Sequence, residues 1–378
     1  MNKFKKPAVA LLFGGRGYER EVSVRGASNL FSLIPSEKYR KIPIFIDPDG
    51  RFLLPDVILT SEAESGKLSE SSPAEATPQE MAVGNIEMRE VHPAYIDGHG
   101  GFIYGGEFLP IDAAFPLLHG DYGEDGILQG ALECAKIAYI GCDVIGSAAA
   151  RDKILLKAIA SSLDIPVARG ILCLPGEVSS VVRESERLFG YPVFVKPTRL
   201  GSSIGAGVAG NRRELYSALI KALSLGSRAV VEEYIDIEKE LECAYFAVSG
   251  KELFTNPGEI CGYGFYDYEK KYALTQAEPK AQGEARTEPE VSDCAELDKE
   301  TRGRVLEYAR RLVRELSLRD LARIDFFLDK NGRLYFNEIN TMPGFTETSL
   351  YMRLVARYGI PPVALICSLI DSAIMRGA

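Results

Sequence analysis

Runs of apolar residues alternate with amphipathic stretches along most of this chain. The first run, Ala8–Phe13, has the length of a buried strand and ends at a pair of glycines. After it, apolar residues recur with the spacing of one helix face, at Val24, Ala27, Leu30 and Phe31. A strand, a glycine turn and a helix in this order predict an α/β architecture.

Later segments repeat this pattern. Ile111–His119 predicts a buried strand, followed by a glycine-rich turn and a helix that begins near Ile127. Val193–Pro197 predicts another strand, and the segment around Arg151-Asp152-Lys153 has the apolar pattern of one helix. Roughly Thr60–Val91 is rich in Ser, Glu, Ala and Pro and has little periodicity, so we expect a surface loop there.

Two short apolar runs near the end of the chain carry acidic and amide side chains. They are joined by Asp329–Gly332, whose Asn-Gly pair favours a hairpin. Glu338 and Asn340 share one face of the second strand, and the hairpin brings Asp325 across from them. Such hard oxygen ligands predict a magnesium site. The alternative is a surface hairpin facing water, which we disfavour because strands are depleted in Asp and Asn.

The middle of the chain carries a candidate phosphate-binding loop. Lys196 ends a predicted strand and is followed by Leu200–Gly205, in which Ser202 and Ser203 add hydroxyl donors to glycine backbone amides. A simple turn is the alternative for the loop alone, and no GxxxxGK[ST] motif occurs.

Carboxylates follow in the next two predicted strands. They could accept hydrogen bonds from adenine or ribose, or only face water. The residues concerned are Glu232, Glu233, Glu240 and Glu242.

Composition narrows the class of protein. The 378 residues suggest two or three domains. With 44 Lys plus Arg against 53 Asp plus Glu, the net charge of −9 argues against nucleic acid as the main partner. No apolar run is long enough to span a membrane, and the run after the basic start is too short for a signal peptide, so we expect a cytoplasmic protein. The seven cysteines fit reduced thiols.

Taken together, the motifs of this chain resemble those of the ATP-grasp superfamily and, within it, of the D-alanine:D-alanine ligases. The matching segments, in chain order, are Gly14-Gly15 with Glu19–Ser23, His119–Gly126, Asp152-Lys153, Lys196-Pro197 with Gly201–Gly205, Phe265–Tyr272, Arg323–Asp325 and Asn337–Gly344. The resemblance implies three domains: an N-terminal open parallel α/β domain at 1–122 that helps bind the first substrate, and two α+β domains at 123–227 and 228–378. The last domain is expected to carry the magnesium site and a lid loop at 262–299.

The implied reaction joins two D-alanine molecules at the expense of ATP, through an acyl phosphate, for peptidoglycan synthesis. ATP is expected between the central and C-terminal domains, with two Mg²⁺ ions, or Mn²⁺, held by Asp325, Glu338 and Asn340. No nucleic acid or membrane partner is implied, and a homodimer is expected.

The resemblance also assigns roles to single residues. The residues expected to bind ATP are Lys153, Lys196, Ser202, Ser203, Glu232, Glu233, Ile235 and Glu240. Glu19 and His119 would bind the first D-alanine, and Lys271, Ser349 and Leu350 the second. Arg323 and the Gly344 amide would stabilise the oxyanion. A link of Glu19, Ser202 and Tyr272 would close the lid.

Some alternatives stay open. The connection from Glu232 to Glu240 lacks the glycine usual in the family and is one residue longer, so the sequence does not decide which acid meets adenine or ribose. The Tyr272 segment favours a dipeptide over a depsipeptide product, whereas D-serine as second substrate is harder to dismiss. Another ATP-grasp carboxylate-amine ligase and a catalytically silent nucleotide-binding module are the other candidates.

Overall fold

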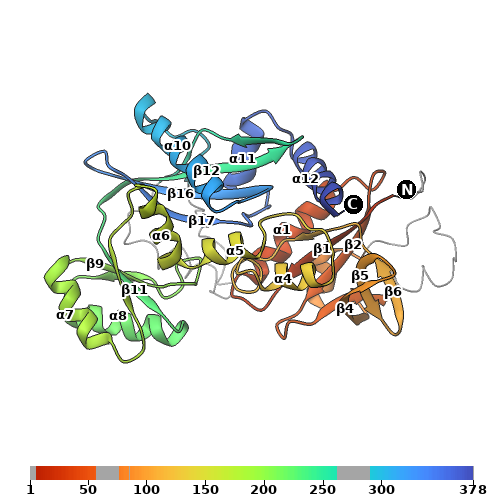
Figure 1. Ribbon diagram of the computed structural model, residues 1–378, viewed down its shortest axis with the longest axis horizontal. Helices are drawn as coiled ribbons and strands as arrows, with labels where there is room; N and C mark the ends of the chain where they lie inside the picture. Colours follow the sequence, from red (N-terminus) through yellow and green to blue (C-terminus); the bar gives the residue numbers. More distant parts are fainter. Residues whose placement is uncertain (1–5, 57–75, 85, 262–289, 378) are drawn as a thin grey trace, which may run out of the picture.

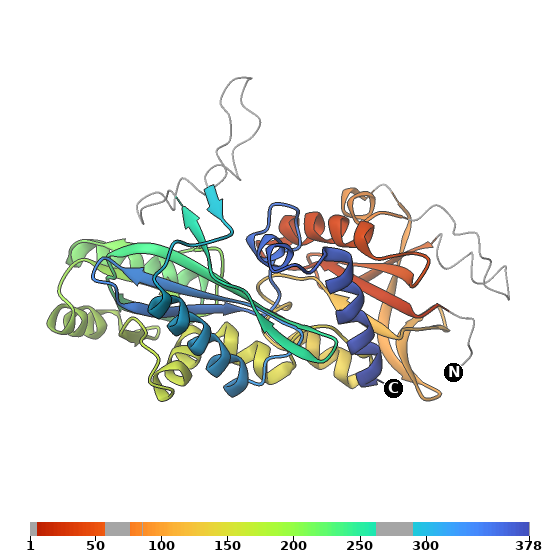
Figure 2. The ribbon, with the colours of Figure 1, turned by 90° about the horizontal axis from the view of Figure 1, so that it is seen from above.

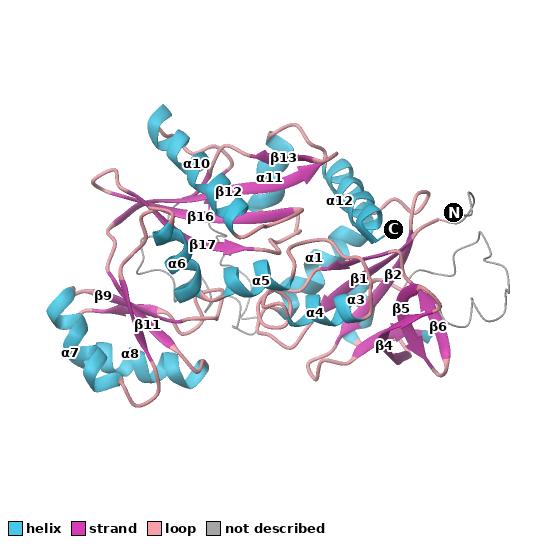
Figure 3. Ribbon diagram, viewed as in Figure 1, coloured by secondary structure: helices cyan, strands magenta, loops and turns pink. Residues whose placement is uncertain are grey.

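Three β-sheets follow one another along the molecule (Figure 1). The structure, a computed structural model, describes residues 6–56, 76–84, 86–261 and 290–377. The first sheet is built by the N-terminal third of the chain, a small sheet by the middle, and a large sheet by the C-terminal third. Figure 3 shows helices packed against all three sheets, so the α/β class predicted from the sequence is confirmed.

The first sheet has the strand order β6-β5-β4-β3-β2-β1-β7. Strand β1 is parallel to β2 and β7, whereas β2 to β6 pair antiparallel and the sheet is therefore mixed rather than parallel throughout. The strands are β1 (Ala8–Gly14), β2 (Arg40–Ile46), β3 (Phe52–Pro55), β4 (Met88–Ile96), β5 (His99–Tyr104), β6 (Glu107–Pro110) and β7 (Ala113–Pro116).

Strand β1 has a hydrophobic core on each face. Val9, Leu11 and Phe13 pack with helix α1 (Arg20–Leu33), whereas Ala8, Ala10 and Leu12 belong to a second core that contains helix α4 (Ile127–Cys134). This double burial explains why the strand reads as a continuous apolar run rather than an alternating one. The helix predicted from Val24 to Phe31 and the helix start at Ile127 are both confirmed.

The segment expected as a surface loop at 60–91 is only partly described, and the described part is ordered. A capping box starts helix α3 (Pro78–Val83), in which the Thr77 side chain and the Glu80 backbone and side chain bond reciprocally. Strand β4 begins at Met88. The loop prediction was therefore wrong for 78–83 and 88–91, because a short capped helix and an exposed antiparallel strand give little apolar periodicity.

The small sheet has the order β10-β9-β11-β8, with antiparallel pairs throughout. Helices α7 (Val178–Leu188) and α8 (Arg212–Leu225) cover one face and share one core with it. The strands are β8 (Gly170–Cys173), β9 (Val193–Pro197), β10 (Gly207–Ala209) and β11 (Ala229–Glu233). Because β11 lies between β9 and β8, this sheet extends beyond the boundary expected at residue 227.

The large sheet has the order β15-β14-β12-β16-β17, and β13 pairs with β12. Its strands are β12 (Ile237–Val248), β13 (Lys251–Phe254), β14 (Gly258–Cys261), β15 (Glu290–Ser292), β16 (Leu321–Asp329) and β17 (Leu334–Asn340). Helices α5 (Val144–Arg151), α6 (Lys153–Ser162) and α10 (Lys299–Glu315) pack on β17. The single helix predicted around Asp152 is wrong, because Asp152 ends α5 in extended backbone and caps α6.

The C-terminal helices α11 (Leu350–Arg357) and α12 (Pro362–Gly377) join the first and large sheets. Their buried residues share one core with β1, β7 and α1, and α12 lies beside the N-terminal strands in Figure 2. Among the described residues, no single helix is long and apolar enough to cross a membrane; only α11 and α12 together, bent by 98°, meet the length and composition criteria.

Gly14 at the end of β1 should be a costly glycine to replace. Its φ is +96°, and a Cβ there would collide with the backbone oxygen of Ile46. We expect Gly14→Ala to lower the free energy of unfolding by about 2–4 kcal/mol, from left-handed strain plus overpacking. Gly98→Ala is the matched control, since φ is +86° but nothing lies within 4 Å of an added Cβ. Urea denaturation should show that the control loses only about 1 kcal/mol of its free energy of unfolding. An equal loss in both variants would contradict the collision at Gly14.

Candidate active site

One cavity of about 400 Å³ is lined by residues of the N-terminal unit, the small sheet and the large sheet. It is lined by the loop after β1, the loop after β9, strands β11, β12, β16 and β17, and the start of α11. All candidate site residues that fall in the described part of the chain line this cavity. Lys271 and Tyr272 lie outside the described residues, as does 262–289 of the expected lid loop.

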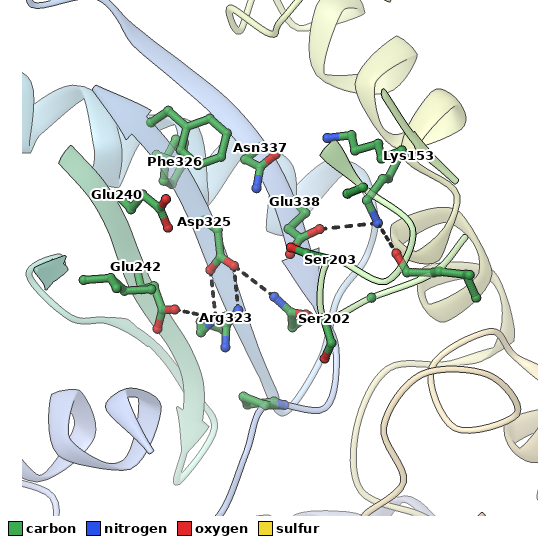
Figure 4. A pocket seen from close by; sticks show the side chains of 18 of the residues that line it. Lys153, Ser202, Ser203, Glu240, Glu242, Arg323, Asp325, Phe326, Asn337 and Glu338 are labelled. Atoms are coloured by element: carbon green, nitrogen blue, oxygen red, sulfur yellow. Dashed lines mark hydrogen bonds and ion pairs between the residues drawn. The ribbon is translucent and has the colours of Figure 1, made fainter. Parts of the chain in front are cut away.

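The predicted metal ligands lie on the hairpin of β16 and β17 (Figure 4). Asp325 is opposite Glu338, and Arg323 is opposite Asn340. A bulge follows, because Phe326 pairs with Phe336 and Asn337 is left over. The bulge resets the side-chain alternation, so that Phe336 joins the core behind the sheet although Glu338, two residues later, faces the cavity.

Arg323 and Asp325 form a bidentate ion pair at the centre of this hairpin. Arg323 donates from Nε to Asp325 Oδ1 at 2.8 Å and from a terminal nitrogen to Oδ2 at 2.7 Å, and its Nε lies 3.4 Å from Glu242 on β12. Burial acts to lower the pKa of Arg323, but the two carboxylates raise that pKa well above its ordinary value. Arg323 is thus a permanent cation facing the cavity.

The two carboxylates of the hairpin have opposite pKa shifts. Burial, with the charge of Glu338, raises the pKa of Asp325 despite Arg323. For Glu338, burial is outweighed by Lys153, Lys196 and Arg323, which lower its pKa. Both carboxylates face one cavity, where a further cation would stabilise them.

The donor set fits a hard divalent ion that needs oxygen ligands. Two carboxylates and the Asn340 amide come from adjacent strands, and the Asn340 amide nitrogen is 3.1 Å from Asp325 Oδ2. Among the described residues, no three His, Cys, Asp or Glu side chains are grouped as metal ligands. A metal site here would therefore need Asn340 as its third protein ligand.

Lysines face this hairpin from the other side of the cavity. The Lys153 ammonium, at the start of α6, donates to the Leu200 backbone oxygen at 2.8 Å and lies 3.4 Å from Glu338 Oε2. Ser202 and Ser203 in the loop after β9 have positive φ values of 50° and 52°, which turn successive backbone groups as anion-binding loops require. The loop and Lys153 thus present donors to the same space as the hairpin (Figure 4).

Glu232 and Lys196 are paired rather than independent. Lys196 lies 3.0 Å from Glu232 Oε2, and Lys157 on α6 contacts Oε1. Burial opposes ionisation of Glu232, but the two lysines lower its pKa to about 2. The neighbouring Glu233 lies 2.6 Å from Arg169.

The N-terminal unit contributes Glu19 and His119. Glu19 accepts a hydrogen bond from the Ser202 hydroxyl, so two members of the predicted lid link are in contact. The His119 Nδ1 is 3.0 Å from the Met342 backbone oxygen. Its Nε2 is buried and has no hydrogen-bond partner among the described residues, so its hydrogen-bonding capacity is unused. On the opposite side, the Ser349 hydroxyl donates to the Gly344 oxygen at 2.6 Å.

Two charged lining residues, Glu124 and Arg151, were not predicted from the sequence. Glu124 is buried and accepts hydrogen bonds from the backbone nitrogens of Gly120 at 2.8 Å and Met342 at 3.2 Å, and burial raises its pKa. Arg151 lies 3.8 Å from Glu124 and 3.2 Å from Asp121. The motif around His119 contained Glu124, but pairing with Arg151 needs the fold.

Comparisons with known proteins agree with this geometry. Residues 8–142 match the family described as D-ala D-ala ligase N-terminus, and residues 160–371 match D-ala D-ala ligase C-terminus. The chain is 35% identical to D-alanine–D-alanine ligase A of Mesorhizobium japonicum, over 98% of each chain. It is 34% identical to the D-alanine–D-alanine ligase of Caldicellulosiruptor bescii, over 100% of this chain and 96% of the relative.

Solved structures of similar proteins share the whole fold. The D-alanine–D-alanine ligase of Coxiella burnetii has a TM-score of 0.78 at 28% identity, covering 98% of this chain and 95% of its own. The VanG D-Ala:D-Ser ligase of Enterococcus faecalis has a TM-score of 0.80 at 26% identity, covering 98% and 100%. With both halves matched and relatives similar over their full lengths, this chain belongs to the D-alanine–D-alanine ligase family of ATP-dependent ligases.

Proposed function

We propose that this protein joins two D-alanine molecules into D-alanyl-D-alanine and converts ATP to ADP and phosphate, for peptidoglycan synthesis. One observation carries the proposal: the lysines and the serine loop on one side of the cavity face the Arg323, Asp325 and Glu338 hairpin on the other. The same cavity reaches Glu19 and His119. Phosphate binding, charge neutralisation and amino-acid binding can therefore occur in one space.

ATP is expected to lie between the small and large sheets, which act as the central and C-terminal domains. Lys153, Lys196 and the amides and hydroxyls of Ser202 and Ser203 bind the phosphates in this proposal. The adenosine lies toward β11, β12 and the connection between them, where Glu232, Glu233, Ile235 and Glu240 line the cavity.

A hard divalent ion would complete the phosphate site. Asp325, Glu338 and Asn340 would hold Mg²⁺, with Mn²⁺ as a substitute, and bound ions would supply positive charge that offsets the phosphate charges. The Lys153 ammonium contacts both Glu338 and the backbone oxygen of Leu200. It therefore lies between the proposed metal ligands and the proposed phosphate-binding loop.

In the first step, Glu19 binds the ammonium of the first D-alanine and His119 Nε2 lies near its carboxylate. A carboxylate oxygen forms a bond to the γ-phosphorus while the bond to the β-phosphate oxygen breaks, which gives an acyl phosphate and ADP. Lys153, Lys196 and Ser202 reduce the repulsion between the two anions that must meet.

In the second step, the amine of the second D-alanine attacks the acyl carbon, loses a proton, and phosphate leaves. Arg323 and the Gly344 backbone N–H stabilise the oxyanion, and the fixed charge of Arg323 supports this role. Ser349, beside Leu350, binds the second carboxylate. Lys271 and Tyr272 are proposed to assist there and in closing the lid.

We extend the proposal to compartment and assembly. A cytoplasmic site is expected because the reaction consumes ATP, and a homodimer is expected from the family resemblance. Light scattering coupled to size-exclusion chromatography tests the dimer, and a monomeric mass at micromolar concentration would contradict it.

The direct test measures phosphate release from MgATP with D-alanine, L-alanine, or D-alanine mixed with D-serine or D-lactate. We expect release that requires D-alanine and a product with the mass of D-alanyl-D-alanine. The similarity to a D-Ala:D-Ser ligase makes D-serine the second candidate for the attacking substrate, and a mixed dipeptide as the main product would favour it. ATP binding without release would reject the ligase proposal.

A further inference from the structure

A third buried lysine, Lys157, lies behind the nucleotide cavity and has no part in the steps above. Its side chain is 9% exposed, and it contacts Glu232 Oε1, whereas Lys196 contacts the other oxygen of the same carboxylate. Glu232 and Lys196 line the cavity; Lys157 is not among the described residues that do. Any effect of Lys157 on a bound nucleotide must therefore act through Glu232.

Helix α6 fixes the position of Lys157. Lys153 and Lys157 are one turn apart and project from the same face of the helix. Lys153 reaches the large sheet through Glu338, and Lys157 reaches the small sheet through Glu232. The Asp152 carboxylate caps the helix at the backbone nitrogens of Ile154 and Leu155, and the helix packs on β17. The two lysines thus present ammonium groups from a rigid element.

Lys196 has two competing roles: it neutralises Glu232, and in the proposed complex it binds a phosphate. Before nucleotide binds, Lys196 helps to neutralise the buried Glu232. In the proposed complex the same ammonium must bind a phosphate. A buried carboxylate that loses its cation is strongly disfavoured, so the move of Lys196 toward phosphate depends on a second cation at Glu232.

Lys157 supplies that cation, although burial disfavours its charged form. Burial lowers the pKa of Lys157 to about 8 although the Glu232 carboxylate opposes the shift. The ammoniums of Lys153 and Lys196 lower this pKa further. Retaining a third buried lysine beside the other two therefore calls for a role, and Glu232 is the carboxylate that it contacts.

We propose that Lys157 is a positioning residue for ATP: it keeps Glu232 neutralised and in place, so that Lys196 is available to the phosphates. This inference rests on the proposed function only in that Lys196 binds ATP phosphate. It concerns nucleotide affinity rather than the bond-forming steps.

The test begins with Lys157→Met, which keeps the apolar stem and removes the charge. We expect the Kd for MgATP, measured by calorimetry without D-alanine, to rise about 10-fold, which corresponds to about 1.4 kcal/mol. The KM for ATP should rise in parallel, while kcat at saturating ATP stays within about twofold. Lys157→Arg should restore most of the affinity, and Lys221→Met, at an exposed lysine of α8, serves as the matched control.

A double-mutant cycle with Glu232→Gln separates this role from general packing. Without the carboxylate, Lys196 is no longer held back, so adding Lys157→Met to Glu232→Gln should change the Kd by less than about threefold. An equal 10-fold loss in both backgrounds would overturn the proposal, as would an unchanged Kd for Lys157→Met alone.

Folding of the variants and activity of the wild type are controlled separately. If Lys157→Met does not fold, the comparison of Glu232→Gln with the double variant still decides, since a 10-fold loss there would overturn the proposal. If wild-type protein binds ATP but does not ligate D-alanine, the ligase proposal fails and the cycle remains valid. If it binds no ATP, this inference fails as well.

Discussion

Glu338→Gln should lower D-alanine-dependent phosphate release by at least about 10²-fold while leaving the fold intact. The substitution keeps the shape of the side chain and an oxygen that can accept a hydrogen bond from Lys153, 3.4 Å away. It removes one of the two carboxylate charges that would hold Mg²⁺. The measurement is steady-state phosphate release at several magnesium concentrations, with circular dichroism as the check on folding.

Glu347→Gln is the matched control for this change. Glu347 is exposed and lies beyond Gly344 in the same connection to α11, so its substitution tests loss of a nearby carboxylate charge outside the hairpin. We expect its turnover to stay within about twofold of the wild type. Undiminished activity of Glu338→Gln would reject the metal assignment, and a higher magnesium requirement in the remaining activity would support it.

The hairpin that carries Asp325 and Glu338 was predictable because its signals are local. Alternating side chains and the Asn-Gly turn are read within twenty residues, and the structure gives the expected antiparallel pairing. The bulge at Asn337 was not predictable in this way. It depends on how Phe326 and Phe336 pack together behind the sheet, with ring centroids 5.8 Å apart.

Elements that depend on distant partners were predicted less well. The strand β11 follows α8 closely, yet it pairs with β9 and β8 of the small sheet. The break at Asp152 was hidden because the apolar pattern continues through it. Its carboxylate accepts hydrogen bonds from Arg199 at 2.9 Å and Arg228 at 3.0 Å, both far along the chain.

The site shows the same division between local and distant signals. Residues within a motif, such as Lys196 and Ser202, could be selected from the sequence and line the cavity. Lys157 looked like any lysine of an amphipathic helix, and only the fold brings it to Glu232, 75 positions later. Buried charge networks of this kind are formed by tertiary structure, so they cannot be predicted from composition or periodicity.

Two substitutions of Arg323 should separate its effect on turnover from its effect on stability. Arg323→Lys keeps a cation but loses the planar fork that binds both oxygens of Asp325, at 2.8 and 2.7 Å. We expect turnover to fall by about 10²-fold with a small change in stability, as for loss of one oxyanion donor. Near-normal turnover in Arg323→Lys would mean that the fork geometry does not contribute to the reaction.

Arg323→Met should also destabilise the protein, and by an amount that depends on pH. Removing this cation leaves Asp325 and Glu242 with uncompensated buried charge, at a cost of about 3–5 kcal/mol near neutral pH. Burial already raises the pKa of Asp325, and loss of Arg323 removes the main opposing influence. A carboxyl whose pKa is higher in the folded state favours folding at low pH and loses that contribution as pH rises. Urea denaturation at pH 5 and pH 8 should therefore show a larger deficit against the wild type at pH 8. A deficit that is equal at both values would mean that the unpaired carboxylates are not its cause.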